Sequence, residues 1–155
     1  ALARVRDDLS RAILQDPALQ PDGIGTDAAP DPADIRRAAQ ARQRAMAAAI
    51  GPLRAQLRGL LATTSPAGAQ LAALDATLEA ALAEQERHHL GAVVQRLERH
   101  VRQAQAAAAA DWRTRALHTA RQVLLAELDL RLQPAQGLLD AMNTADTLAP
   151  QGDAA

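Results

Sequence analysis

The residue alphabet of this chain is the feature that most constrains its fold. Of its 155 residues 48% are hydrophobic, yet Trp112 is the only aromatic residue, cysteine is absent, and all 17 basic residues are arginine. Ala, Leu, Arg and Gln lose little side-chain entropy in a helix, whereas the β-branched and aromatic residues that suit a pleated sheet are scarce. The alphabet therefore predicts an all-α protein.

The apolar residues that are available indicate long, paired helices. The chain is the size of one domain, and its core must be built from Leu, Ile, Val and Ala. Because an alanine methyl contributes much less than a large side chain, stability requires close helix contacts over a long distance. We expect an elongated antiparallel helical bundle with long kinked helices, forming a single domain over residues 1–142 and leaving a frayed tail over 143–155.

The first half of the chain predicts two helices and a linker. Apolar residues spaced by three and four predict an amphipathic helix over residues 2–15. Residues 17–31, rich in proline, glycine and acidic residues, predict a mobile linker inside the domain. Asp31-Pro32 predicts the start of a long helix, with the acid as N-cap. Its apolar spacing keeps its phase through Gly51-Pro52, which indicates one kinked helix.

The second half begins at a short helical hairpin, with Ser65 as N-cap and Pro66 at the first helical position. Residues 66–132 contain no proline, so they form one long rod or fold back near Gly91 or near Asp111. A short last helix is expected from Pro134 to Met142. The apolar face of the returning helix is predicted to contain Leu71, Leu74, Leu78, Leu82, Leu90, Val93, Leu97 and Val101.

Charge is segregated along the chain, although the net charge is only −1. Residues 35–73 carry six arginines and no acid, whereas residues 74–86 carry four acids and no arginine. A hairpin at Ser65 brings these two segments together, and such pairs help to fix register more than stability. The expected pairs are Arg54 and Arg58 with Asp75 and Glu79, and Arg44 with Glu84 and Glu86.

Farther from the hairpin, the same pairing sets like charges opposite each other. The predicted basic cluster consists of Arg36, Arg37, Arg42, Arg96, Arg99 and Arg102. In one interpretation an acidic terminal segment covers the cluster, within the chain or across an oligomer. In the other, the cluster is an anion patch that binds nucleic acid, another polyanion or a partner. The net charge excludes a globally basic nucleic-acid binder. Binding of nucleic acid through this cluster is therefore kept only as the alternative to a protein partner.

The segment 124–132 is rich in leucines that cover two helix faces. A single neighbouring helix cannot bury both faces, so we expect this segment at the centre of the bundle or at a subunit interface. The predicted interface residues are Trp112, Leu124, Leu125, Leu128 and Leu132. The leading hypothesis is a non-enzymatic helical scaffold or adaptor that acts through self-association, as a homo-oligomer, or through a protein partner.

Chemistry-bearing motifs are weak. Glu86 and His89 have the Glu-x-x-His spacing of di-iron bundles, but the chain has no second copy of that motif, so a surface charge pair is the expectation. No serine or threonine sits on a nucleophile elbow, and no glycine-rich loop follows a strand. We therefore expect no catalytic residue, no metal and no cofactor. The longest uncharged stretch, residues 59–74, is too short and interrupted for membrane insertion.

Three segments carry a resemblance to a known family. They are residues 1–6 (ALARVR), 44–54 (RAMAAAIGPLR) and 124–134 (LLAELDLRLQP). With them the chain resembles an uncharacterised proteobacterial family of helical proteins, a domain of unknown function. The resemblance implies a bacterial, cytoplasmic protein, and it supplies no functional residue to carry over.

Overall fold

The computed structural model of the chain describes residues 1–21 and 31–148. These residues form helices in the order α1 (Leu2–Leu14), η1 (Pro17–Leu19, a 3-10 helix), α2 (Pro32–Ala62), α3 (Pro66–Ala107) and α4 (Trp112–Leu148). No strand occurs in the described part of the chain. The prediction of an all-α protein is confirmed.

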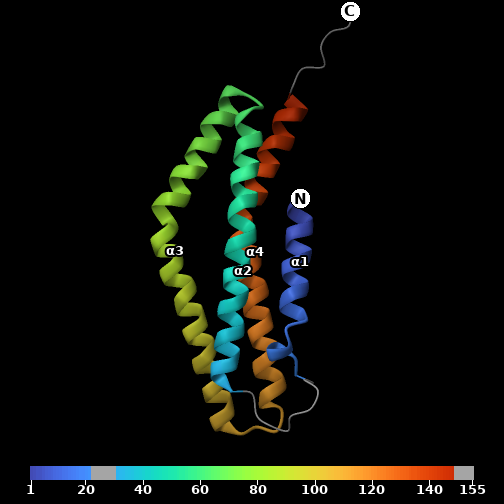
Figure 1. Cartoon of the computed structure of the whole chain (residues 1–155), viewed down its shortest axis with the longest axis vertical. Helices are drawn as coiled ribbons and strands as arrows, with labels where there is room; N and C mark the ends of the chain where they lie inside the picture. The colour runs from blue at the N-terminus through green and yellow to red at the C-terminus, as the bar shows by residue number, and fades with distance from the viewer. Residues whose placement is uncertain (22–30, 149–155) are drawn as a thin grey trace, which may run out of the picture.

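The helices form an elongated bundle around a common long axis. In Figure 1, α2 rises, α3 returns and α4 rises again, while the shorter α1 descends beside α4. Helix α3 contacts α2 and α4, whereas α1 packs against the other side of α4 and α2. The antiparallel bundle expected from the alphabet is thus the observed architecture.

The predicted helix starts at Asp31-Pro32 and Ser65-Pro66 are confirmed. The Asp31 carboxylate accepts a hydrogen bond from the Ala33 amide at 2.8 Å, and the Ser65 hydroxyl accepts one from the Gly68 amide at 3.0 Å. Each bond satisfies an amide that has no partner within its helix. Helix α2 also continues through Pro52, as its unbroken apolar phase predicts.

The second half of the chain has fewer breaks than expected. Helix α3 passes Gly91 without interruption and ends at Ala107, followed by Ala108 in the left-handed region with φ of 51°. Of the two expected break points, the one near Asp111 is therefore correct. The prediction of a separate final helix from Pro134 to Met142 is wrong, because Pro134 lies inside α4, which continues to Leu148. The buried spacing keeps its phase across this proline, from Leu132 to Ala135 and Leu138.

The linker predicted at 17–31 is wrong for its first residues. Pro17–Leu19 form η1, whose first turn is capped by a 3.0 Å hydrogen bond from the Ala18 amide to the Asp16 carboxylate. Leu19 is fully buried in the core, which anchors this segment. The tail predicted at 143–155 is helical as far as Leu148, where α4 ends. The rest of the linker prediction, for residues 22–30, and of the tail prediction, for residues 149–155, lies outside the described residues.

Two apolar clusters hold the bundle together. The large core lies where α1, η1 and α4 meet the first half of α2 and the second half of α3, and it includes Met46, Leu97, Val101, Leu117 and Leu124. The small core lies toward the hairpin and consists of Leu2, Leu53, Leu57, Leu61, Ala72, Ala135 and Leu138. Helix α3 supplies Val94, Leu97 and Val101 to the large core but only Ala72 to the small one.

Candidate interaction surface

A row of half-exposed leucines runs along the hairpin half of α3. The exposed fractions are 41% for Leu71, 54% for Leu74, 47% for Leu78 and 50% for Leu82. The spacing by three and four residues places them on one helix face. We call these four residues the leucine row. The sequence pattern predicts one apolar face that contains them together with Leu97 and Val101. This prediction is wrong, because the structure buries Leu97 and Val101 and leaves the leucine row half-exposed.

The face of α3 that points into the bundle is formed by the residues that directly follow those of the leucine row. It consists of Gly68, Ala72, Asp75, Glu79 and Ala83, and then Leu90, Val94, Leu97 and Val101, which keep the same spacing. Since successive residues are about 100° apart around a helix, the leucine row lies to one side of the contact with α2. Leu82 and Leu90 are eight positions apart, which corresponds to two full turns plus about 80°. The apolar side chains before and after this point therefore lie on different faces of α3.

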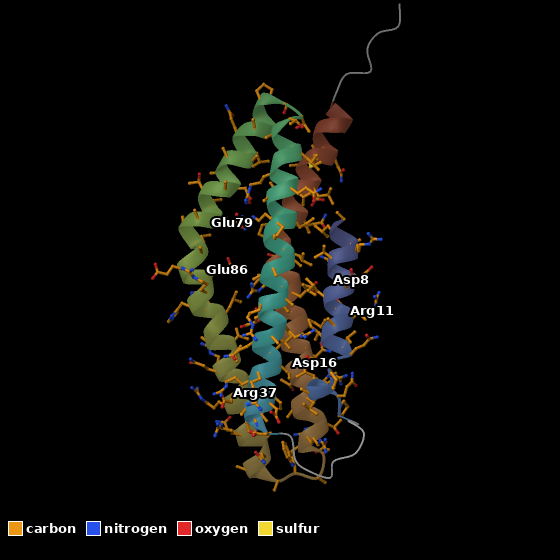
Figure 2. All side chains as sticks on the ribbon, in the orientation of Figure 1. Asp8, Arg11, Asp16, Arg37, Glu79 and Glu86 are labelled. Carbon is orange, nitrogen blue, oxygen red and sulfur yellow. The ribbon has the colours of Figure 1, made fainter. Side chains whose placement is uncertain are left out.

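Ion pairs with α2 fix this rotation of α3. Asp75 receives hydrogen bonds from Arg54 at 2.9 and 2.6 Å and from Arg58 at 3.0 Å, and Arg58 also reaches Glu79 at 2.5 Å. These predicted pairs are confirmed. Figure 2 shows Glu79 on the side of α3 toward α2. Turning α3 to bury the leucine row would separate all four side chains.

The charges in this network stabilise one another. Burial alone would raise the pKa of Asp75, but the hydrogen bonds and positive charges of Arg54 and Arg58 outweigh it and lower that pKa. Burial likewise opposes the charged form of Arg58, yet the two carboxylates raise its pKa. The side chains of Arg54 and Asp75 are each only 13% exposed, so water screens this pair less than a surface pair.

Close backbone approach fixes the same rotation at the hairpin. A Cβ added to Gly68 would meet the Leu61 carbonyl oxygen and lie 2.6 Å from the Thr64 hydroxyl. Only glycine therefore fits at this position, and α3 begins in tight contact with the end of α2. The leucine row starts three residues later, already turned away from α2.

The margin of the leucine row that faces away from α2 carries no charged residue, whereas the margin toward α2 holds Asp75, which is paired with Arg54 and Arg58. The neighbours on the margin away from α2 are exposed and small or neutral: Ala67, Gln70, Thr77, Ala81 and Gln85. An exposed apolar strip with neutral neighbours is typical of a surface that packs against another helix. Nothing in the described part of the chain covers it, because α1 packs on the opposite side of α2 and α4.

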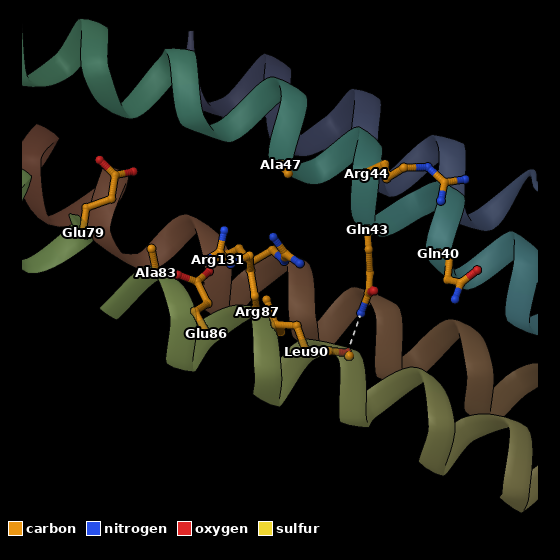
Figure 3. Close-up of a pocket in the computed structure, with 11 residues that line it drawn as sticks. Gln40, Gln43, Arg44, Ala47, Glu79, Ala83, Glu86, Arg87, Leu90 and Arg131 are labelled. Carbon is orange, nitrogen blue, oxygen red and sulfur yellow. Dashed lines mark hydrogen bonds between the residues drawn. The ribbon is translucent and has the colours of Figure 1, made fainter. Parts of the chain in front are cut away.

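Beside the end of the leucine row, α3 bows away from α2 and leaves a groove of about 540 Å³, which is lined on α3 by residues between Glu79 and Gly91. Glu127, only 5% exposed, lies beside this groove and accepts hydrogen bonds from Gln43 at 3.0 Å and Arg131 at 2.9 Å. Gln43 also donates to the Leu90 carbonyl at 3.0 Å, as Figure 3 shows. The junction links α2, α3 and α4, and its carboxylate is already satisfied.

One predicted charge contact is wrong. Arg44 and Glu86 both line this groove, but no ion pair joins Arg44 to Glu84 or Glu86 among the described side chains. The outward bow of α3 separates its middle from α2, so the hairpin register no longer brings opposite residues into contact there.

The predicted interface at 124–132 is wrong for its three central leucines. Leu124 and Leu128 are 1% exposed and Leu132 is fully buried, all within the chain's own core. Leu125 and Trp112 are half-buried and pack against the same core. The segment 124–132 lies at the centre of the bundle, between several helices of one chain. This was the alternative to a subunit interface.

The structure divides the predicted anion patch into paired and unpaired arginines. Arg36 and Arg102 both contact Glu98, at 3.4 and 2.7 Å, and the hydrogen bond from Arg102 lowers the pKa of Glu98. Arg37 pairs with Asp34, and Arg42 lies 3.3 Å from Asp16. Within residues 1–21 and 31–148, Arg96 and Arg99 have no ion-pair partner and are exposed.

The described residues hold no group of three or more side chains suited to a metal ion. His89 lies 3.4 Å from Gln85 across one turn of α3, and Glu86 lines the groove. None of the described helices is long and apolar enough to cross a membrane.

Similarity to known proteins identifies the family of the chain but no activity. No curated protein and no solved structure matches the chain significantly. The expected resemblance to an uncharacterised family is confirmed, since a family model covers residues 1–144. The chain belongs to the protein family of unknown function DUF3348.

Proposed function

We propose that this protein is a non-enzymatic helical scaffold or adaptor, and that it acts by packing the leucine row of α3 against a helix of another polypeptide. The observation that carries the proposal is the exposure of four leucines on one face, between 41% and 54% each. A leucine face on a surface helix is costly to leave in water, because burial of the exposed half of each such side chain would stabilise by about 1 kcal/mol.

The attachment of α3 supports a docking role. Its rotation is held by Arg54, Arg58 and Asp75, so the leucine row stays on the surface even though the small core lies close by. Ion pairs and a glycine contact thus present the row in a fixed orientation. A preorganised helix face binds with a smaller loss of conformational freedom than a flexible one.

The test places a photo-activated cross-linking amino acid at Ala81, an exposed position between Leu78 and Leu82. In cells that express the full chain, illumination is expected to join this position to a helix of a polypeptide identified by mass spectrometry. The adduct should disappear when Leu74→Gln and Leu78→Gln are added. The matched control carries the same probe at Gln122, an exposed position on α4. No adduct at position 81, or one that persists without the leucines, would contradict the proposal.

A second candidate function is binding of nucleic acid or another polyanion through Arg96 and Arg99. It is supported by their exposure and by the lack of an ion pair for either among the described residues. Arg96→Gln/Arg99→Gln should then weaken binding of a labelled DNA duplex and reduce the slope of log affinity against log salt by about 2. Equal anisotropy titrations for both proteins would remove this candidate.

A further inference from the structure

We infer that the partner of the leucine row is the same row of a second copy of this chain, paired antiparallel. This inference rests on the proposed function and adds the identity and orientation of the partner. It follows from three properties of the hairpin half of α3: the order of its apolar residues, the position of its acidic residues and the size of the strip.

The leucine row reads almost the same in both directions. When two copies of α3 are set antiparallel, Leu71 lies opposite Leu82 of the second copy, and Leu74 lies opposite Leu78 of the second copy. The next positions outward, Ala67 and Gln85, then also meet. A two-fold axis requires such self-complementarity, because the same patch serves both subunits. The contact extends about 16 Å between Leu71 and Leu82.

Acidic residues favour the antiparallel orientation over the parallel one. In a parallel pair each residue meets its own copy, so Glu86, at the end of the leucine row, would lie near the like charge of the second copy. In the antiparallel pair Glu86 follows Gln85 and therefore lies next to Ala67, in the first turn of α3 of the second copy. This first turn contains no acidic residue, and the positive end of the helix dipole attracts a carboxylate there.

The size of the strip predicts a reversible dimer. Four half-exposed leucines with small, neutral neighbours on each copy bury on the order of 1,000 Å² in total, the lower end for specific interfaces. An apolar seam of that size corresponds to a dissociation constant of about 1–100 μM. Because the leucine contacts at the centre of the seam involve no charged side chain, dimer formation should depend little on salt.

The first experiment measures mass by sedimentation equilibrium of the full chain between about 1 and 300 μM. The mass is expected to rise from 16.3 kDa toward twice that value. Leu74→Gln/Leu78→Gln should raise the dissociation constant at least about tenfold, with an unchanged helical circular dichroism spectrum. The matched control is Leu130→Gln, which alters a leucine of 58% exposure on α4 and should leave the dimer unchanged.

The second experiment tests the orientation with cysteines, which the chain lacks. Ala67→Cys and Gln85→Cys are made separately, one carrying an affinity tag, then mixed and oxidised. The antiparallel pair predicts a disulfide between the two different variants. Disulfides within each variant only would mean a parallel pair and overturn the inference.

Failure of this inference is distinguishable from failure of the proposed function. A wild-type chain that stays monomeric up to about 300 μM and gives no mixed disulfide overturns pairing between copies. The cross-linking test at Ala81 then decides whether the row binds a different helix. A dimer that Leu130→Gln disrupts, but the double leucine variant does not, likewise overturns the inference, because the seam would lie elsewhere.

Discussion

The two halves of α3 are attached to the same bundle by different forces. The half after Leu90 buries Val94, Leu97 and Val101 in the large core, to 4% exposure or less. The half before it contributes Ala72 to the small core and is held mainly by Arg54 and Arg58. Apolar packing thus turns one half's large side chains inward, whereas ion pairing leaves the other half's leucines outside.

This difference teaches that hydrophobic spacing alone does not decide which face a helix buries. Large apolar residues occur at helical spacing in both halves, but in the hairpin half the inward positions are occupied by glycine, alanine and carboxylates. An arginine pair opposite two carboxylates is a directional contact, and apolar burial is not. Where the two compete, the directional contact fixes the rotation of the helix.

The largest expected effect contrasts one leucine from each half. Leu97→Ala should lower the free energy of unfolding by about 2–5 kcal/mol, because it leaves a cavity in the large core. Leu74→Ala, at 54% exposure, should cost no more than about 0.5 kcal/mol. Urea unfolding below the dimer concentration, followed by circular dichroism, measures both. Equal losses would show that the two halves are packed alike.

A second prediction removes the ionic attachment of the hairpin half. Asp75→Asn should cost about 2 kcal/mol at pH 7, because Arg54 and Arg58 lose their shared carboxylate. Since the folded pKa of Asp75 is lowered, its contribution is present above the unfolded pKa of about 4 and is lost as the pH falls through the folded pKa. The wild type and the variant should therefore converge in urea titrations at low pH.

The matched control for that prediction is Asp8→Asn. Asp8 pairs with Arg11 on the surface, where the carboxylate is 61% exposed, so its loss should change stability by less than about 0.5 kcal/mol. A gap between wild type and Asp75→Asn that stays constant down to pH 2 would argue against a charged role for Asp75.

A third prediction compares two glycines of α3. Gly68→Ala should destabilise by about 1–3 kcal/mol, because its Cβ would press on the Leu61 carbonyl and the Thr64 hydroxyl. Gly91→Ala meets nothing within 4 Å and should stabilise the helix by about 0.5–1 kcal/mol. Thermal unfolding of the two variants should shift in opposite directions. A stable Gly68→Ala variant would mean that α3 can turn at the hairpin.

The smallest effect is expected at the far end of α3. Ala108 has a φ of 51°, a conformation that favours glycine. Ala108→Gly should therefore raise the free energy of unfolding by about 0.5–1 kcal/mol. Hydrogen exchange should show more protection near the end of α3 and unchanged protection near the leucine row. A loss of stability would mean that this C-cap carries no strain.

Much of the helix layout follows from local sequence signals. Asp31 and Ser65, each followed by proline, mark helix starts because their side chains accept a hydrogen bond from an otherwise unpaired amide. The pairing of Arg54 and Arg58 with Asp75 also follows from the hairpin, since a short turn fixes which residues lie opposite. The continuity of α4 through Pro134 was also predictable, because Leu128, Leu132, Ala135 and Leu138 keep the spacing of one helix face across the proline. The same argument correctly predicts that α2 continues through Pro52.

The candidate surface could not be predicted in the same way. The shift between Leu82 and Leu90 is visible in the sequence, but it does not say which of the two faces is buried. The leucines at 124–132 were predicted to form an interface, and they are buried instead. An interface and a core between several helices require the same pattern of leucines on two faces. Burial depends on how many neighbouring helices surround a segment, and spacing does not count them.

The sequence by itself determined that the chain is helical, where its hairpin lies and which charges meet beside it, because these depend on contacts between residues close in the chain or opposite a short turn. Only the tertiary structure decided which leucines are buried. That choice depends on the rotation of α3 and on which helices surround α4, and these are set by contacts between residues far apart in the chain. The leucine row on α3 is exposed for this reason.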